Sequence, residues 1–179
     1  DLNTFQELQL WNSAECVRPR ALAEEATPHQ ATIAGGATPG IRSATRRQLD
    51  YHTYNKAFID SLLTVCKQKN AWGFSTFDGE SGLPSVDVVC YEPGDFYKSH
   101  TDWGNKYQNR KISFTIQLTD PDQYDGGDVW LYDGPEAWHV SKAQGSMTLW
   151  PSWTLHSVDP VLRGERWSVV GWVLGPPFI

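Results

Sequence analysis

The segment Lys111-Ile-Ser-Phe-Thr-Ile-Gln-Leu118 has the strongest periodic pattern in this chain of 179 residues. Its residues alternate between apolar and polar, which predicts a β-strand with two unlike faces. One face carries Ile112, Phe114, Ile116 and Leu118, and the other carries Ser113, Thr115 and Gln117. The polar face fits either of two arrangements: exposure to solvent, or the inside of a small barrel whose outer face is covered by helices.

Other segments of the second half of the chain also have the composition and period of strands. Turns rich in Gly, Pro and Asp separate them. The predicted strands are Val86–Tyr91, Asp128–Tyr132, Ser146–Leu149 and Arg166–Val173. Many short strands of this kind favour a β-sandwich or barrel.

The first part of the chain has helical spacing instead. Ser13 is positioned to cap a helix from Ala14 to about Ala26, and a second helix is predicted over Thr53–Lys69. Between them, Ala34–Gly40 has the composition of a loop. We therefore expect one mainly β domain over residues 1–179, with a helical support region at 1–75 and a β core at 76–179.

Composition and charge exclude some classes of protein. The net charge is −6 and the pI is near 5.3, so the chain lacks the surplus of Lys and Arg that nucleic-acid binding needs. No apolar run is long enough to cross a membrane. The chain begins at Asp1 rather than Met, which is compatible with a removed targeting segment, and we expect a cytoplasmic protein.

The cysteines are few and scattered. Cys16, Cys66 and Cys90 lack the paired spacing of a zinc site and are too few for a disulfide framework. We expect buried free thiols in a reducing compartment.

The sharpest local motif is His100-Thr-Asp102. In a strand, positions i and i+2 face the same way, so this imidazole and this carboxylate can converge on one metal ion. His156 is the best candidate for a second imidazole. Two His and one carboxylate leave three positions open on an octahedral ion, as in Fe(II) oxygenases. An isolated His-x-Asp is more often structural, so this motif needs support from elsewhere.

The remaining residues of these types have ordinary explanations. We interpret His29 and His52, in the helical part, as surface or core residues. We interpret His139, in a predicted turn, in the same way. Asp95 and Asp159 are interpreted as turn or capping residues.

Support comes from Arg166, ten residues after His156. On a strand, Arg166 and Ser168 face the same way, together with Val170 and Trp172. A buried Arg needs a carboxylate partner, so a dicarboxylate that chelates iron at one end could reach Arg166 with its other end. The alternative is a surface ion pair with an acid such as Glu165. Arg163 is a rival candidate, although Gly164 places it near a turn.

A series of motifs in this order resembles the prolyl 4-hydroxylase-like branch of the Fe(II)/2-oxoglutarate-dependent oxygenases, and most of all the bacterial PKHD-type hydroxylases. The resemblance covers about half of the chain, from Val86 to the C-terminus. The motifs are Tyr91-Glu-Pro-Gly-Asp-Phe-Tyr97, His100-Thr-Asp102, Arg110-Lys-Ile-Ser-Phe, Gln117-Leu-Thr-Asp-Pro, Tyr124-Asp-Gly-Gly-Asp128, Trp150-Pro-Ser, His156-Ser-Val-Asp-Pro-Val161 and Gly164-Glu-Arg166.

The resemblance implies a double-stranded β-helix, that is, a cupin-like jelly-roll barrel with supporting N-terminal helices. It implies Fe(II) at His100, Asp102 and His156, and 2-oxoglutarate as a co-substrate bound by Arg166, together with O2 and with ascorbate as a supporting reductant. Further 2-oxoglutarate residues by the same match are Tyr91, Ser168, Gln117 and Trp172. Gln117 departs from the family, because several relatives have a tyrosine there that touches the distal carboxylate.

The resemblance also implies hydroxylation of an unactivated C–H bond, because relatives that halogenate replace the carboxylate at the position of Asp102. Prolyl hydroxylation of a peptide or protein is the first expectation, and a free amino acid or other small molecule is the alternative substrate. A substrate rim is predicted at Tyr97, Trp103, Arg110 and Trp153. The segments 103–110 and 73–84 are candidate lids.

Two other classes of protein are compatible with the triad alone: a non-redox, metal-binding jelly-roll module, and a zinc hydrolase. Neither requires Arg166 and Ser168 on one face of a strand. The sequence does not distinguish a monomer from a dimer.

Overall fold

The computed structural model describes residues 4–25, 28–30, 40–52 and 55–179. The helices are α1 (Val17–Glu24), α2 (Lys56–Gln68), the short α3 (Gly79–Gly82) and a 3-10 turn, η1 (Pro121–Gln123). The strands are β1 (Gln6–Gln9), β2 (Pro28–Gln30), β3 (Arg42–Ser43), β4 (Thr45–Asp50), β5 (Ser85–Tyr91), β6 (Phe96–His100), β7 (Arg110–Gln117), β8 (Asp125–Gly126), β9 (Val129–Asp133), β10 (Glu136–His139), β11 (Ser146–Pro151), β12 (Leu155–Val158), β13 (Val161–Arg163) and β14 (Arg166–Leu174).

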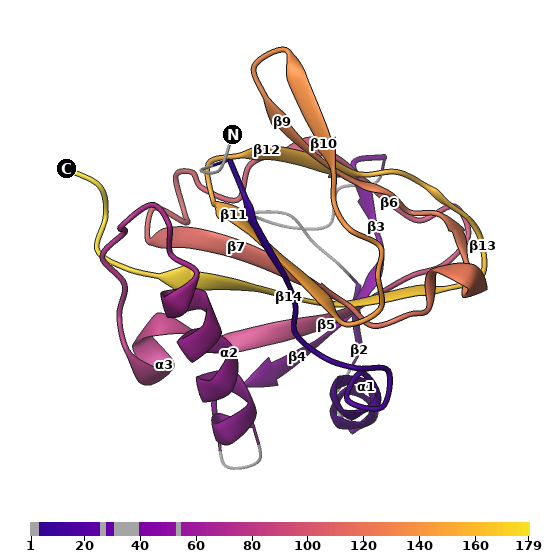
Figure 1. Ribbon diagram of the computed structural model, residues 1–179, viewed down its shortest axis with the longest axis horizontal. Coiled ribbons are helices and arrows are strands. Elements are labelled where there is room, and N and C mark those ends of the chain that lie inside the picture. The colour runs from indigo at the N-terminus through magenta and orange to yellow at the C-terminus, as the bar shows by residue number, and fades with distance from the viewer. Residues whose placement is uncertain (1–3, 26–27, 31–39, 53–54) are drawn as a thin grey trace.

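Most of these strands form two sheets. The larger has seven strands in the order β1-β11-β7-β14-β5-β4-β2, and the smaller has five in the order β10-β9-β12-β6-β3. Figure 1 shows the two sheets facing each other, with α1, α2 and α3 beyond the larger one. Among the described residues, no strand pairing joins the two sheets, so this jelly roll is not closed into a hydrogen-bonded barrel.

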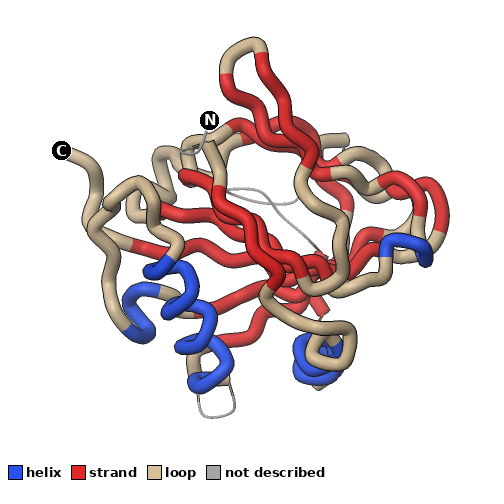
Figure 2. The backbone as a smooth tube through the Cα atoms, in the orientation of Figure 1, coloured by secondary structure: helices blue, strands red, loops and turns tan. Residues whose placement is uncertain are grey.

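The apolar face of β7 is covered by helices. Its residues Ile112, Phe114 and Ile116 belong to a buried cluster with Phe58 and Leu62 of α2. The helices on the outer side of the large sheet are seen in Figure 2. The polar face of β7 therefore lies between the two sheets, where Ser113 and Thr115 are buried. Of the two arrangements that the sequence allows, the structure shows the second.

A second buried cluster lies between the sheets. It joins residues of the large sheet to residues of the small one, namely Val89, Tyr91, Trp150, Val129, Leu131 and Val158. This cluster holds the two sheets together around the polar face of β7.

The predicted elements are found with shifted ends. All five predicted strands are present, as β5, β7, β9, β11 and β14. Helix α2 lies within the predicted helix 53–69, and helix α1 lies within the predicted helix 14–26 and is shorter than it. Cys16, not Ser13, occupies the N-cap of α1, and its side chain makes no capping hydrogen bond. Residues 26, 34–39 and 53–54, to which these predictions also extended, lie outside the described residues.

The region 1–75, which we predicted as a helical support region, also contains strands. In that region β1, β2 and β4 join the large sheet and β3 joins the small one. Their sequences lack an apolar alternation, as in Thr45-Arg-Arg-Gln-Leu-Asp50. Strand β4 forms because it pairs along its whole length with β5, a tertiary contact that local sequence does not encode.

All three cysteines are buried free thiols, as predicted. In the part of the chain that the structure describes, no helix has the length and apolar character that a membrane crossing requires.

Candidate active site

Two histidines are brought together by the pairing of β6 with β12. His100 is the last residue of β6, His156 lies in β12, and the two are direct partners in the antiparallel register. Asp102 does not share a strand with His100, which corrects the prediction, because β6 ends at His100. The chain turns there, and the backbone N–H groups of Asp102 and Trp103 both donate to the Ser152 carbonyl. That turn brings the Asp102 carboxylate beside both rings.

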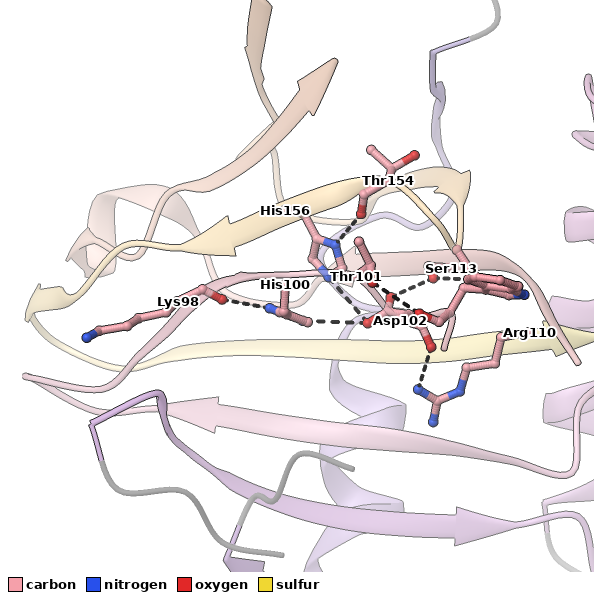
Figure 3. Close-up of polar contacts among 10 residues, drawn as sticks. Lys98, His100, Thr101, Asp102, Arg110, Ser113, Thr154 and His156 are labelled. Atoms are coloured by element: carbon pink, nitrogen blue, oxygen red, sulfur yellow. Dashed lines mark hydrogen bonds and ion pairs between the residues drawn. The ribbon is translucent and has the colours of Figure 1, made fainter. Parts of the chain in front are cut away.

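The side chains of His100, Asp102 and His156 converge on one point. One ligand atom from each lies within 4.8 Å of the other two. Asp102 Oδ1 is 3.5 Å from Nε2 of His100 and 3.5 Å from Nε2 of His156, as Figure 3 shows. In the described part of the chain, this is the one group of three His, Cys, Asp or Glu residues that could hold a metal ion.

The other nitrogen of each ring is fixed by a backbone carbonyl. Nδ1 of His100 lies 2.7 Å from the Lys98 carbonyl, and Nδ1 of His156 lies 2.9 Å from that of Thr154. Because a carbonyl only accepts, each Nδ1 carries the hydrogen, and a neutral ring then turns the lone pair of Nε2 toward the carboxylate. A hydrogen bond from the ring nitrogen that does not face the metal to a carbonyl is typical of metal-binding histidines.

Asp102 is held by hydroxyl groups on the side away from the rings. The Ser113 hydroxyl donates to Oδ2 at 2.6 Å and contacts the Ser152 hydroxyl at 3.0 Å. Burial by itself raises the pKa of Asp102, but His156, His100 and the Ser113 hydrogen bond outweigh it, so the pKa lies well below its usual range. Burial lowers the pKa of His156, against the opposing effect of Asp102. An ionised carboxylate and a neutral imidazole are the forms that bind metal.

The donor set fits Fe(II). It supplies two imidazole nitrogens and one carboxylate oxygen, which is the combination found in non-haem iron sites with open positions. The open side faces a cavity of about 290 Å³ between the sheets, which the three side chains help to line.

A buried guanidinium lies elsewhere in the wall of the same cavity. Arg166 is 2% exposed, its Nε donates to Gln117 Oε1 at 3.2 Å, and its Cζ lies 5.4 Å from the centre of the Tyr91 ring. None of the ion pairs among the described residues involves it. The Ser168 hydroxyl is also buried and has no hydrogen-bond partner. A dicarboxylate that reached both groups would supply the missing acceptor oxygens.

Glycine makes room for this arginine. A Cβ on Gly127 would lie 3.1 Å from Cδ of Arg166, and the positive φ of +67° at Gly127 also favours glycine.

Gln117 is buried next to the arginine rather than in the cavity wall, and its Nε2 donates to Thr115 Oγ1 at 3.4 Å. Gln117 therefore orients Arg166 in this structure.

The rival Arg163 lies outside this site. It is exposed on β13, where its Nε forms an ion pair with Asp125 Oδ2 at 2.7 Å. Its neighbour Gly164 turns the chain so that Arg166, and not Arg163, enters the sheet.

The predicted substrate residues fall into two pairs. Tyr97 and Arg110 line the cavity, with the Tyr97 ring stacked on His100 at 3.4 Å between centroids. Trp103 and Trp153 are 41% and 50% exposed and lie outside the cavity wall. Trp172 lines the cavity and stacks on the guanidinium of Arg110.

The sequence-based prediction missed several residues of the cavity wall, namely Arg42, Arg46, Asp87, Tyr107 and Trp150. Asp87 carried a usable signal, because it is the one charged residue in the apolar strand Val86–Tyr91 and alternates in phase with Tyr91. The arginines carried none, since they belong to a segment that looks like a solvated loop.

The other histidines lie outside the triad. His52 follows β4 and is exposed, with Glu80 3.9 Å away. His139 lies in β10 rather than in a turn and is 3.2 Å from Asp128. The backbone of His29 belongs to β2, not to a helix. Asp95 has the predicted turn role, because its carboxylate accepts from the Glu92 N–H.

Comparison with known proteins agrees with this geometry. The model of the 2OG-Fe(II) oxygenase superfamily matches residues 86–174, which include the triad and Arg166. The chain belongs to this superfamily.

Among relatives of this superfamily member, a PKHD-type hydroxylase from Synechococcus sp. (strain JA-2-3B'a(2-13)) is 38% identical over 134 residues. That match covers 71% of the chain and 58% of the relative, so the chain spans less than two thirds of the relative's length.

Two solved structures share the fold. A prolyl-4-hydroxylase from Pseudomonas putida is 22% identical, with a TM-score of 0.71 over 97% of this chain and 94% of that one. A prolyl hydroxylase from Trichoplax adhaerens, in complex with a peptide fragment of the hypoxia inducible factor oxygen degradation domain, is 19% identical. Its TM-score is 0.75 over 96% of this chain and 84% of that chain. At these levels of sequence identity, both comparisons establish similarity of fold alone.

Proposed function

We propose that this chain is a 2-oxoglutarate-dependent dioxygenase that hydroxylates a prolyl residue of a peptide or protein. One observation carries the proposal: a triad suited to Fe(II) and a buried arginine without an acidic partner line the same cavity. A metal-binding module or a zinc hydrolase has no use for the second feature.

The residues of the triad would hold the iron. When bound, iron with 2-oxoglutarate and O2 supplies the oxidant that attacks a C–H bond. The chain contributes orientation: the Lys98 and Thr154 carbonyls fix the two rings, and the Ser113 hydroxyl fixes the carboxylate. The presence of a carboxylate at Asp102 supports hydroxylation rather than halogenation.

Arg166 and Ser168 would bind the far carboxylate of 2-oxoglutarate. The Nε of Arg166 is engaged by Gln117, which leaves its two terminal nitrogens for a carboxylate. Tyr91 lies beside them and would position the carbon chain. Trp172 would close the cavity near the metal. These groups are buried, so water competes weakly for the co-substrate.

A prolyl substrate is supported by the relatives. The curated relative is named a PKHD-type hydroxylase, and both solved structures are named prolyl hydroxylases, one of them with a bound peptide. Tyr97 and Arg110 would contact the target residue, while Trp103 and Trp153 would contact flanking residues outside the cavity. The net charge of −6 supports a substrate other than nucleic acid.

The reaction is tested by succinate release from 2-oxoglutarate. We expect release that requires Fe(II), is supported by ascorbate and is lost in Asp102→Ala. Arg163→Gln is the matched control and should retain it, because Arg163 lies outside the cavity. Normal turnover in Asp102→Ala, or Zn(II)-supported hydrolysis without 2-oxoglutarate, would reject the proposal.

The substrate is tested with a library of proline-containing peptides and mass spectrometry. We expect a gain of one oxygen located to a prolyl residue, in the wild type but not in Asp102→Ala. A gain located only to other residues would reject proline and keep the reaction class.

A further inference from the structure

Four charged side chains of the cavity wall have no part in the iron or 2-oxoglutarate sites. They come from β3, β4, β5 and β7 and are Arg42, Arg46, Asp87 and Arg110. Asp87 lies four residues from Tyr91 along β5, roughly 13 Å at the rise of an extended strand, and Tyr91 is the strand partner of Arg166. Asp87 therefore lies well along the sheet from the position of Arg166.

Asp87 is the carboxylate of this cluster. Asp87 is 2% exposed, and its Oδ2 pairs with NH1 of Arg46 at 3.2 Å. Burial raises the pKa of Asp87, while the charges of Arg46, Arg42 and Arg110 oppose that rise. The ion pair between Arg46 and Asp87 is thus the direct contact within the cluster.

Arg110 is the member best placed to bind a ligand. Its guanidinium lies 3.7 Å from the centre of the Tyr107 ring and 3.9 Å from that of Trp172. Its NH1 donates to the backbone carbonyl of Asp102 at 3.4 Å, which Figure 3 shows, so the group lies close to the metal ligands. Among the described residues, no carboxylate forms an ion pair with Arg110.

The charge of Arg110 is not balanced by an ion pair. Asp102 is assigned to the metal and Arg166 to the co-substrate, and Asp87 pairs with Arg46, which leaves the guanidinium of Arg110 without a carboxylate of its own among the described residues of the wall. A partly buried charge without a counter-charge is costly, and it is commonly compensated by a ligand. A peptide carbonyl would accept a hydrogen bond from Arg110 but would leave the positive charge in place. A carboxylate does both, and the planar guanidinium fixed between two rings matches it.

We propose that the substrate carries a free carboxylate within one residue of the oxidised position, and that Arg110 binds it with support from Arg46. The carboxylate is either the side chain of an acidic neighbour or the carboxyl terminus itself. This inference rests on the proposed function, because it specifies the substrate of that reaction.

The test measures binding of acid–amide pairs to the Fe(II) and 2-oxoglutarate holoenzyme without oxygen, by calorimetry. One pair is N-acetyl-prolyl-aspartate amide and N-acetyl-prolyl-asparagine amide, which probes an acidic neighbour. The other is N-acetyl-proline and N-acetyl-prolinamide, which probes the carboxyl terminus. We expect the acid to bind at least about tenfold more tightly in one pair, the effect of one charged hydrogen-bonded contact.

Variants separate the charge effect from a structural one. Arg110→Gln should remove the preference for the acid, and Arg46→Gln should reduce it. Asp87→Asn removes the one negative charge of the cluster and should strengthen the preference, an effect in the opposite direction that general loosening of the cavity does not produce. Arg163→Gln is the control and should bind both probes as the wild type does. Circular dichroism checks that each variant is folded.

Equal affinity for acid and amide in both pairs, absence of binding in both, or a preference that survives in Arg110→Gln would overturn the inference. Succinate release from the same preparation tests the reaction separately. Release without any acid preference rejects the carboxylate alone, whereas an acid preference without release keeps the carboxylate site and rejects the reaction.

Discussion

His100 and His156 are direct partners across the antiparallel strands β6 and β12, with their ring centroids 4.2 Å apart. Two adjacent strands therefore fix both imidazoles, and only the third ligand depends on a turn. That turn is anchored by Ser152, whose carbonyl accepts the N–H groups of Asp102 and Trp103 and whose own N–H donates to the Lys111 carbonyl of β7. The candidate metal site thus connects the two sheets.

Ser113→Ala should weaken metal binding. The variant removes the 2.6 Å hydrogen bond to Asp102 Oδ2, so the carboxylate group of Asp102 can rotate more freely. Loss of a hydrogen bond that orients a metal-binding side chain lowers metal affinity about 10- to 100-fold. Anaerobic Fe(II) titration of the wild type and the variant measures it. Ser61→Ala, on the outer side of α2, is the control, and an equal effect in both would contradict the role of Ser113.

Gln117 should act on 2-oxoglutarate affinity through Arg166. In Gln117→Leu the Arg166 Nε loses its acceptor, and we expect about tenfold weaker binding of 2-oxoglutarate. Gln117→Glu should weaken it further, because a carboxylate there pairs with Arg166 and competes with the co-substrate. Calorimetric titration measures the affinity of both variants for 2-oxoglutarate. Arg166→Ala, which removes the guanidinium altogether, gives the largest loss of affinity to be expected. Unchanged affinity in Gln117→Glu would show that Gln117 does not position the arginine.

The sequence predicted the parts of this molecule that follow a local pattern. The alternation in Lys111–Leu118 and in Arg166–Val173 identified β7 and β14, and thereby the shared face of Arg166 and Ser168. The candidate ligand residues were predicted from residue types and their order alone. The geometry proposed for them was wrong at Asp102, because the end of β6 depends on Ser152, fifty residues away in sequence.

Two arginines of the charged cluster in the cavity wall, Arg42 and Arg46, were not predictable in the same way. Arg42 and Arg46 lie in β3 and β4, whose sequences are polar apart from Leu49. Pairing with β6 and β5 creates these strands, and it is this pairing that brings the arginines into the cavity. Tertiary pairing of this kind overrides weak local preferences.

The thiols should be unreactive in the folded protein. Burial raises the pKa of Cys66 well above its usual range, and burial together with Glu165 raises that of Cys90 to about 12. Because the thiolate is the reactive form, iodoacetamide at pH 8 should leave the native protein unmodified and should alkylate Cys16, Cys66 and Cys90 in urea. Intact-mass spectrometry counts the adducts, and rapid labelling of the native protein would contradict this burial.

Asp128 should make stability depend on pH at the base of the β9–β10 hairpin. Its Oδ1 lies 2.8 Å from Lys142 Nζ and 3.2 Å from His139 Nε2; burial raises its pKa, but these partners lower it overall. A lowered carboxyl pKa stabilises the fold above the unfolded value and loses that effect as pH falls through the folded value. Asp128→Asn should therefore destabilise the protein at pH 7 and much less at pH 3, as urea unfolding measures. An equal loss at both values would contradict the ionic origin.

Metal binding should stabilise the fold through the triad. The ligands come from β6, the turn after it and β12, so unfolding separates them and a metal binds only the native state. At a free concentration of 100 times the dissociation constant, the gain is about 2.7 kcal/mol. We expect anaerobic Fe(II) to raise the melting temperature of the wild type but not of Asp102→Ala. His52→Ala, which removes an exposed histidine, is the control and should keep the full increase. A metal-induced rise in Asp102→Ala would place the bound ion elsewhere.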